Sequence, residues 1–598
     1  MDELNGSVLV VVALIIVIGI TVAFTVDLSD GDLPDMLSDE DDQVEIEDFI
    51  RTDDKLIDRQ PTRGDFGFED GDPPSAVIEF EPFEEVSTEI GFEYESTYRG
   101  TGIISRSGVY VVDYNNNGYE DILATGGNSP VLFENTGDGY KPAHEFDHPE
   151  TRAAHFFDFN NNGYRDLLLA EYGGELVFYA NERGTFEPRE VGLTSSVRSP
   201  TSITSADFTG NGCLDLFVAQ NGLWQQGEPL DPRHAREVWE NHPVVRPEPS
   251  PGGENLLFYG DCSRFWEVTE QAGISGKNWT LATSAADFSG NGYPDIHVGN
   301  DFSADFLYEN NGDGTFDRSD LGPETDRNAM SSVATDLTGN HHLDLFVTNV
   351  YFPDGVWSIS TELPRLSAVP DGNNLLVNDG TGEFTDKAPD HGLHRGGWGW
   401  AAVMADFTND GHRDVVHAAS IEAPVEAYDE YRAMQLWKGL PESWEAGDSE
   451  ALGIDPHESR GLVRVDFAND GRLDLVVATT TSGVRGGEGP TPFAFYENQH
   501  TNDEALQFFV RNPDGLARGA DVYVQTDTRT VYRTVTARGD FLSQNSRLLH
   551  IGAANEEVQA VTIVWPDGTE SIHEDLEAGN RYIVTPDGAT IVEKRCEH

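Results

Sequence analysis

The sequence predicts an all-β chain: a seven-bladed β-propeller followed by a small β-rich C-terminal domain, with one transmembrane helix at the N-terminus. The first observation is an acidic, glycine-containing turn between two apolar runs, which recurs seven times along the chain. The second is the abundance of turn residues, 61 Gly and 30 Pro, which divide the apolar runs into strand-length pieces. The third is an uncharged apolar run of 19 residues at 8–26. Repeats of this kind are typical of propellers, and the apolar run has the length of a bilayer-spanning helix.

The N-terminal segment is predicted to be a retained membrane anchor rather than a cleaved signal. The short tail, residues 1–7, carries Asp2 and Glu3 instead of basic residues, and no small-residue cleavage pattern follows the apolar core. The nearest basic residues, Arg51 and Lys55, lie too far away to orient the helix by charge. Residues 27–75 are acidic and poor in aliphatic side chains, so we expect an extended, disordered stalk.

The charge balance is extreme, with 106 acidic against 38 basic residues and a formal net charge of −68. The acidic residues are spread along the whole chain, whereas a surface for a basic partner would concentrate them in one patch. At molar salt the Debye length is about 3 Å, which screens the self-repulsion. We therefore predict that the chain comes from a halophile. No basic stripe is present to neutralise phosphates, so nucleic acid is not an expected partner.

The propeller is predicted to occupy residues 76–505. Each acidic turn is followed by an apolar strand that ends in Asn or Gly, as at residues 132–135. One such unit cannot bury both faces of its own sheet, so neighbouring units must pack together. Residues 83–94 resemble the first strands of later units and are expected to supply a strand that closes the ring. A linear solenoid is the alternative architecture.

The turns have the pattern Asp-x-Asn-x-Asn-Gly-x-x-Asp, which matches the first nine positions of an EF-hand calcium loop. Side-chain oxygens fall at positions 1, 3, 5 and 9, and position 7 offers a backbone carbonyl. A single copy would be an ordinary Asx turn, but seven copies in fixed register favour Ca²⁺, because oxygen ligands suit calcium better than zinc or copper. The candidate ligands are Asp113, Asn115, Asn117, Tyr119 and Asp121 (loop 1); Asp158, Asn160, Asn162, Tyr164 and Asp166 (loop 2); Asp207, Thr209, Asn211, Cys213 and Asp215 (loop 3); Asp287, Ser289, Asn291, Tyr293 and Asp295 (loop 4); Asp336, Thr338, Asn340, His342 and Asp344 (loop 5); Asp406, Thr408, Asp410, His412 and Asp414 (loop 6); and Asp466, Asp470, Arg472 and Asp474 (loop 7).

The seven loops are not equivalent. Loops 1, 2, 3, 4 and 6 keep every ligand position, whereas loop 5 has His341 in place of the bend-forming Gly and loop 7 has Ala468 at position 3. We therefore expect five good calcium sites and two weak ones, with a structural role for the metal. The loops carry few carboxylates and no Glu at position 12, which predicts a Kd on the order of 10⁻⁴–10⁻³ M. Such loops fill outside the cell, where the Asn278 sequon would also be glycosylated.

The repeats resemble the FG-GAP/VCBS repeats of integrin-α-type propellers. The tail, residues 506–588, resembles the ASPIC/UnbV domain that follows FG-GAP repeats in the cartilage acidic protein family. That resemblance rests on residues 519–522, 539–544, 549–552 and 561–568. It implies a secreted or surface-displayed, calcium-dependent protein with a small β-rich C-terminal domain. Residues 589–598 are predicted to be a C-terminal tail.

No catalytic motif stands out, so the chain is predicted not to be an enzyme. Residues 144–148 fit the His-Glu-x-x-His zinc pattern, but that site needs a helix, and here Pro149 and predicted strands surround it. His341 and His342 are adjacent, so their side chains should point to opposite faces. The alternative is an enzyme with its active site in the central channel of the propeller.

The remaining features concern packing and partners. Trp398 and Trp400 are expected to pack near the central channel, or else to form a stacking platform for a sugar or aromatic ligand. Of the three cysteines, Cys213 and Cys262 could form a disulfide or stay free, and Cys596 is left over.

Two long insertions, residues 222–253 and 351–372, are expected to form the partner-binding surface. Together these features predict a membrane-anchored, extracellular, calcium-binding surface module that recognises a protein or a glycan in an adhesion-like role.

Overall fold

The computed structural model describes residues 79–97, 107–221, 252–351, 372–419, 434–480 and 491–592, apart from short gaps, together with residues 45, 46, 49 and 50 and the short strands β13 (Trp224–Gln225) and β14 (Glu228–Pro229). The predicted membrane helix, nearly all of the stalk, most of both insertions and the C-terminal tail lie outside these residues. The helices that the described residues form have neither the length nor the apolar stretch of a bilayer-crossing segment. All elements below belong to the unit formed by residues 46–598.

Seven antiparallel sheets, each with four strands in meander order, follow one another through the described part of residues 83–498. From inside outwards they are sheet 1, with β3 (Gly108–Val112), β4 (Asp121–Thr125), β5 (Val131–Asn135) and β6 (Tyr140–Glu145); sheet 2, with β7 (Thr151–Phe157), β8 (Asp166–Glu171), β9 (Leu176–Glu182) and β10 (Thr185–Pro188); sheet 3, with β11 (Pro200–Ala206), β12 (Asp215–Gln220), β16 (Leu256–Gly260) and β17 (Phe265–Glu267); sheet 4, with β19 (Thr280–Ala286), β20 (Asp295–Asn300), β21 (Phe306–Asn310) and β22 (Phe316–Asp320); sheet 5, with β23 (Ser331–Thr335), β24 (Asp344–Thr348), β25 (Asn374–Asn378) and β26 (Phe384–Asp386); sheet 6, with β27 (Gly399–Ala405), β28 (Asp414–Ala419), β29 (Gln435–Leu440) and β30 (Ser443–Ala446); and sheet 7, with β31 (Ser459–Val465), β32 (Asp474–Thr479), β34 (Ala494–Asn498) and β1 (Phe83–Glu85).

The smaller elements of this region connect or flank the sheets. Two short strand pairs are β2 (Glu95–Ser96) with β33 (Thr491–Pro492) and β15 (Gly253–Glu254) with β18 (Lys277–Asn278). The helical turns are η4 (Pro323–Thr325) and α2 (Ala388–His391). The regular secondary structure of the described region is therefore almost entirely strand, which confirms the predicted all-β class.

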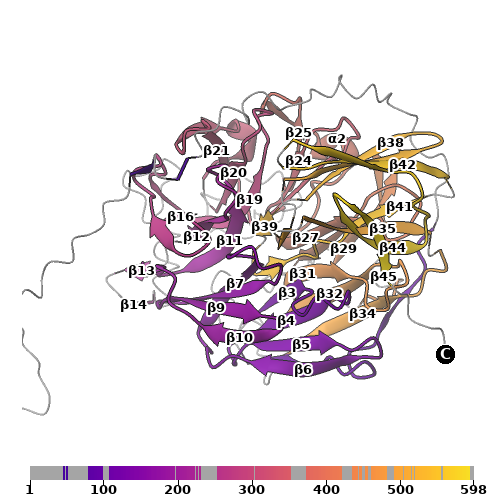
Figure 1. Cartoon of the computed structure of the whole chain (residues 1–598), viewed down its shortest axis with the longest axis horizontal. Coiled ribbons are helices and arrows are strands. Elements are labelled where there is room, and N and C mark those ends of the chain that lie inside the picture. The colour runs from indigo at the N-terminus through magenta and orange to yellow at the C-terminus, as the bar shows by residue number, and fades with distance from the viewer. Residues whose placement is uncertain are drawn as a thin grey trace, which may run out of the picture. The chain divides into compact units, whose positions relative to one another are not determined.

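The sheets are arranged around a common axis in a propeller-like way (Figure 1). The innermost strand of each sheet packs against that of the next, and β31 of sheet 7 packs against β3 of sheet 1. The outermost strand of sheet 7 is β1, which comes from the N-terminal side and pairs with β34. The prediction that residues 83–94 supply a closing strand is thus confirmed.

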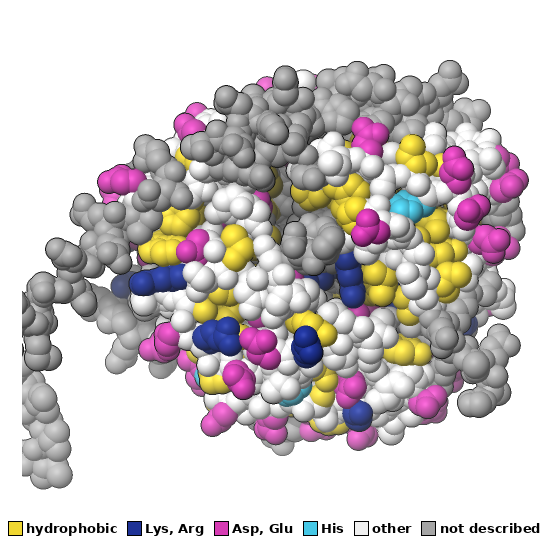
Figure 2. Space-filling model, in the orientation of Figure 1, with side chains coloured by type: hydrophobic (Ala, Val, Ile, Leu, Met, Phe, Trp, Pro, Cys, Tyr) yellow, Lys and Arg dark blue, Asp and Glu magenta, His cyan; other side chains and the backbone are white. Residues whose placement is uncertain are grey.

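Apolar side chains fill the spaces between neighbouring sheets. Between sheets 7 and 1, for example, Val111 and Phe133 pack with Val463 and Phe495, and all four are buried. The innermost strands are buried along their whole length, as in β7 and β11, because both of their faces are covered by other strands. On the face seen in Figure 2, Asp and Glu side chains are spread around the periphery, not gathered into one patch.

The C-terminal domain consists of two further sheets packed around their own core. One contains β35 (Ala505–Asn512), β36 (Gly515–Leu516), β41 (Leu549–Gly552), β44 (Asn580–Thr585) and β45 (Gly588–Val592), and the other β37 (Asp521–Thr526), β38 (Thr530–Thr534), β42 (Val558–Val564) and β43 (Glu570–His573). The core between them includes Phe508, Val522, Ile563 and Trp565. These two sheets form the small β-rich C-terminal domain that the sequence predicts.

One segment of this domain, residues 537–545, leaves it and enters the axis of the ring; we call it the axial segment. Its strand β39 (Ala537–Gly539) pairs with β19, and β40 (Ser543–Gln544) pairs in parallel with β3. Figure 1 shows β39 at the centre, surrounded by the innermost strands. The Gln544 side chain accepts a hydrogen bond from Phe156 N (2.8 Å) and donates one to Phe156 O (3.0 Å).

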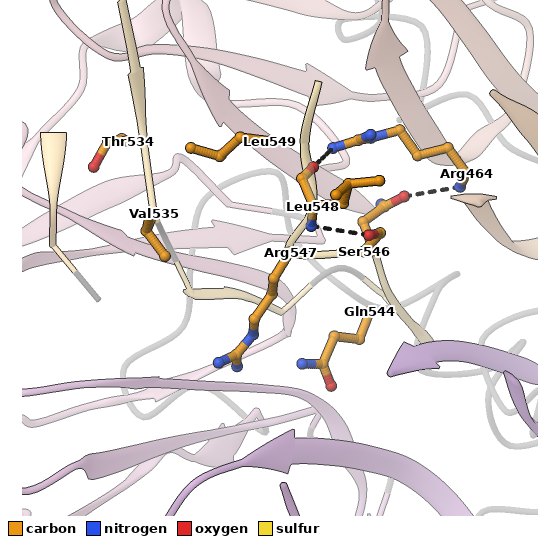
Figure 3. Close-up of a pocket in the computed structure, with 9 residues that line it drawn as sticks. Arg464, Thr534, Val535, Gln544, Ser546, Arg547, Leu548 and Leu549 are labelled. Carbon is orange, nitrogen blue, oxygen red and sulfur yellow. Dashed lines mark hydrogen bonds between the residues drawn. The ribbon is translucent and has the colours of Figure 1, made fainter. Parts of the chain in front are cut away.

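The axial segment also carries the apolar contacts of the centre. Phe541 and Leu542 are buried, and the Phe541 ring lies 5.4 Å from the ring of Trp400. Where the chain returns to the C-terminal domain, Arg464 N donates to Asn545 Oδ1 (3.0 Å) and Arg464 Nη2 to Leu548 O (2.8 Å), beside a cavity lined by both parts of the chain (Figure 3). No feature of the sequence predicted this insertion.

Candidate metal centres

Each predicted loop is the hairpin turn between the first and second strands of its sheet. The residue at position 9 of every loop is the first residue of the second strand, as Asp121 is for β4 and Asp295 for β20. The Asp at position 1 follows the innermost strand directly. The pleat of a regular hairpin therefore brings the two carboxylates of each loop to the same corner of the sheet.

Two backbone positions of every loop are left-handed. Position 6 has φ between 86° and 92° at the six Gly residues, and His341 takes the same region in loop 5 with φ 63°. Position 4 has φ between 55° and 72°, and it is Asn or Gly in all seven loops. Those residue types adopt this conformation at the lowest cost. The restriction of position 4 to Asn or Gly is visible in the sequence and indicates this backbone conformation.

The carboxylates organise the loop through backbone hydrogen bonds, as loop 4 shows. Asp287 accepts from Asn291 N (3.0 Å) and Gly292 N (2.9 Å), and Asp295 accepts from Phe288 N (2.9 Å) and Asn310 N (2.9 Å). The position-5 oxygen accepts the N–H of position 7 in each of the seven loops. Positions 1, 5, 7 and 9 are therefore drawn together.

The strand-ending Asn noted in the sequence joins neighbouring sheets. Its side-chain amide donates to the position-2 carbonyl of the preceding loop, as Asn310 does to Phe208 O (2.9 Å) and Asn135 to Phe467 O (3.0 Å). The second of these bonds links sheet 1 to sheet 7 across the closure of the ring.

The position-4 Asn residues add a chain of bonds from loop to loop. Each donates its amide to the position-6 carbonyl of the following loop: Asn409 to Gly471 (2.9 Å), Asn469 to Gly118 (3.3 Å), Asn116 to Gly163 (2.8 Å) and Asn161 to Gly212 (2.9 Å). Loops 6, 7, 1, 2 and 3 are thus connected in order on one face of the ring.

Loops 3 and 4 each pair a buried carboxylate, Asp215 or Asp295, with a half-buried one at position 1, and backbone N–H groups stabilise both. Burial raises the pKa of Asp207 to about 6, and burial followed by the charge of Asp207 raises the pKa of Asp215 well above its ordinary value. Burial, and to a smaller extent the charge of Asp287, raises the pKa of Asp295 to about 7. Two desolvated carboxylates in contact repel each other, so these corners favour a cation.

The hydroxyl groups at position 3 also support a cation at these corners. Thr209 Oγ1 lies 3.5 Å from Asp207 Oδ1 and 3.5 Å from Asp215 Oδ2, so three oxygens converge in loop 3. In loop 6, Thr408 Oγ1 is buried and has no hydrogen-bond partner among the described residues. The described residues contain no group of three or more His, Cys, Asp or Glu side chains placed to hold a metal. The oxygen donors are instead mixed: carboxylate, amide and hydroxyl. The donor set fits Ca²⁺ and not a soft metal.

Other loops have a guanidinium group beside a carboxylate. Arg581 of the C-terminal domain lies 2.9 Å from Asp466 in loop 7, and Arg511 lies 3.2 Å from Asp113 in loop 1. In loop 5 the His341 ring lies against Tyr523 and Tyr532. The C-terminal domain thus contacts the face of the ring that carries the loops. No sequence pattern near Arg581 indicated this role.

The remaining candidates have structural partners. His144 Nε2 lies 3.1 Å from Gly184 O, whereas His148 lies between Glu171 (2.9 Å) and the Tyr179 hydroxyl (2.8 Å). The two histidines are not on one helix, since His144 belongs to strand β6.

His341 packs on the C-terminal domain, while the ring of His342 lies close to Gly380. Trp400 is buried, and Trp398 is stacked on it at 6.4 Å. Cys213 and Cys262 form a disulfide, which settles a pairing that the sequence left open.

The carboxylate pKa values predict how calcium dependence varies with pH. In the metal-free protein the raised pKa values of Asp207 and Asp295 favour folding at low pH, and that contribution is lost as the pH rises towards 7. Calcium requires the ionised carboxylates and therefore binds better at high pH. The difference in Tm between calcium and chelator should grow from pH 5 to pH 7.5. A constant or shrinking difference would contradict this assignment.

Comparison with known proteins supports the two-part organisation. The chain matches the family of FG-GAP-like repeats at residues 113–169, 158–218, 287–347 and 366–417, and the family "ASPIC and UnbV" at residues 511–591. These matches confirm the resemblance seen in the sequence; the halophilic source stays a prediction.

The curated relatives are cartilage acidic proteins. The human cartilage acidic protein 1 is 22% identical over 410 residues, which is 67% of this chain and 56% of that protein. The Xenopus tropicalis protein of the same name is 23% identical over 282 residues, or 46% of this chain and 40% of that protein. The chain thus spans about half the length of these relatives.

The matches among solved structures include BBS1N in complex with ARL6DN, with a TM-score of 0.38 and 8% identity over 71% of this chain and 99% of that chain. They also include Saccharomyces cerevisiae Sqt1, with a TM-score of 0.37 and 8% identity over 68% of this chain and 97% of that chain. From the repeats, the tail and the curated relatives together, the chain consists of FG-GAP-like repeats followed by an ASPIC and UnbV domain, and it is similar in sequence to cartilage acidic protein 1.

Proposed function

We propose that this chain is a calcium-stabilised, membrane-anchored surface module whose propeller binds a protein or a glycan outside the cell. The observation that carries the proposal is the series of hairpin corners on one face, each with a buried carboxylate at position 9 and a buried or half-buried one at position 1. Calcium would neutralise those charges and hold the first two strands of each sheet together. Calcium would then be required for the shape of the binding surface and would take no part in a reaction.

The proposal includes a closed ring of seven blades. It is supported by the neighbouring innermost strands β31 and β3, by the bond from Asn135 to Phe467 O, and by the position of β1 in sheet 7. A linear solenoid would leave its first and last sheets apart. Because sheet 7 takes strands from both ends of the repeat region, closure depends on the two ends meeting.

Loops 3 and 4 are the calcium sites with the strongest support. Their carboxylates are buried at position 9 and half-buried at position 1, and the groups that stabilise their charge are backbone N–H and hydroxyl groups. Loops 1, 2 and 6 keep every predicted ligand, but each has a guanidinium group nearby: Arg511 at Asp113, Arg165 at Asp158 (3.9 Å) and Arg529 near Asp406. We expect these three loops to bind calcium more weakly.

A binding role is favoured over catalysis by the contents of the ring axis. An active site in the central channel would need converging polar side chains and access for substrate. Phe541 and Leu542 of the axial segment lie there instead, buried against Trp400 and Met330. The stacked Trp398 and Trp400 accordingly support packing around the axial segment better than a sugar platform.

The location and the metal can be tested in one experiment. Intact cells are treated with a protease that does not cross membranes, in buffers of fixed ionic strength containing millimolar calcium or a chelator. We expect an intact propeller fragment in calcium and rapid degradation in chelator. Full protection under both conditions, with cleavage only after lysis, would place the propeller inside the cell and refute the proposal.

A further inference from the structure

Loop 7 is the loop whose position 3, Ala468, has no side-chain oxygen, yet its two carboxylates are as buried as those elsewhere. Asp466 is 0% exposed and Asp474 is 4% exposed. A desolvated carboxylate pair of this kind needs a positive charge nearby. Loop 7 therefore needs a positive charge, as loops 3 and 4 do, but it has one calcium ligand fewer than they have.

A guanidinium group of the C-terminal domain lies at this position. Arg581 Nη2 is 2.9 Å from Asp466 Oδ2, and the two side chains are 1% and 0% exposed. Gln507 supports both partners, since its Nε2 donates to Asp466 Oδ2 (3.0 Å) and its Oε1 accepts from Arg581 Nε (3.0 Å). The arginine is thus held in place from two sides.

The same guanidinium reaches across the closure of the ring. Arg581 Nη1 donates to Gly118 O of loop 1 (3.0 Å) and to the Asn469 side chain of loop 7. Gly118 O also accepts the amide of Asn469. Arg581 therefore bridges the first and last sheets, where no peptide bond joins the innermost strands.

We propose that Arg581 takes the place of the calcium ion in loop 7, so that the C-terminal domain docks on the seam between sheets 7 and 1 without metal. The inference rests on the proposed function, because it treats the other loops as calcium sites. It explains why loop 7 can dispense with a ligand at position 3: the positive charge of a guanidinium offsets the carboxylate without the shell of further oxygens that a calcium ion requires. It also predicts that a chelator destabilises the other loops at a lower concentration than the contact between sheets 7 and 1.

The test uses the full-length protein and three variants. R581M removes the charge while keeping an apolar side chain of similar length. The double variant A468N/R581M also restores an oxygen at position 3. The control R189M removes a guanidinium outside the loops, which pairs with Glu182 and is 46% exposed. Bound calcium is counted by mass spectrometry after desalting, and Tm is measured with and without calcium.

We expect R581M to lower Tm by on the order of 5 °C, because an unpaired buried carboxylate remains, and R189M to stay close to wild type. The double variant should bind one calcium ion more per chain than wild type, and calcium should raise its Tm. If R581M melts like R189M, or if the double variant binds no additional ion, the inference is overturned.

A measurement on the wild-type protein tests the inference even if R581M does not fold. In crystals grown with calcium, an anomalous difference map should show peaks in loops 3 and 4 and none between Asp466 and Asp474. A peak in loop 7 beside the others would overturn this inference alone. The absence of peaks from all seven loops would overturn the calcium proposal on which it rests.

Discussion

Replacing Asp295 by Ala should be among the most damaging single changes in the propeller. Its carboxylate accepts hydrogen bonds from Phe288 N (2.9 Å), Ser289 N (2.8 Å) and Asn310 N (2.9 Å), and the residue is 0% exposed. The substitution leaves two buried N–H groups and the half-buried Ser289 N–H without their acceptor, and it removes a calcium ligand. We expect the free energy of unfolding to fall by about 3–6 kcal/mol, measured by denaturant unfolding in millimolar calcium.

Asp317→Ala is the matched control, since Asp317 lies exposed on strand β22 of the same sheet. It should change the free energy of unfolding by no more than about 0.5 kcal/mol. D295A should also lose one bound calcium ion, whereas D317A should keep all of them. Equal stability of the two variants would contradict the role given to position 9.

Phe541→Ala should separate the ring from its axial segment. The Phe541 side chain is buried among Trp400, Leu281 and Met330, so its truncation leaves a cavity that the surrounding strands cannot fill. The expected cost is about 3–5 kcal/mol in the free energy of unfolding. Because the lost contacts join the C-terminal domain to the innermost strands, proteolysis should also release that domain more readily.

Ile572→Ala provides the comparison, because Ile572 is a large apolar residue of the same domain that is 62% exposed. Its truncation should leave both stability and the proteolysis pattern nearly unchanged. If F541A behaves like I572A, the axial segment does not fasten the domain to the ring.

The repeated part of the fold could be predicted because its signals are local. The strand lengths, the loop positions and the closing strand β1 follow from apolar runs and turn residues within one unit. His341 stands in place of the bend-forming Gly, and its φ of 63° lies in the same left-handed region as the Gly residues of the other loops. Repetition made each weak signal reliable, since seven copies share one register.

The missed features all depend on contacts between residues far apart in sequence. The axial segment has no repeat and no unusual composition, and its place is defined by pairing with β19 and β3, which lie more than two hundred residues away in the chain. Arg581 meets Asp466 only after the C-terminal domain has docked. The Cys213–Cys262 disulfide likewise needed the folded hairpins of sheet 3 to bring the two residues within 5.2 Å, Cα to Cα.

The central claim is that buried oxygen-rich corners bind calcium and thereby stabilise the ring. Its most direct test compares the Tm of the purified protein in strong chelator and in 10 mM calcium. The ionic strength is high and the same in both buffers, because salt screens the repulsion that a net charge of −68 produces. Two loops saturated at about a hundred times their Kd predict a Tm higher in calcium by on the order of 5 °C. Identical melting curves in the two buffers would contradict the claim.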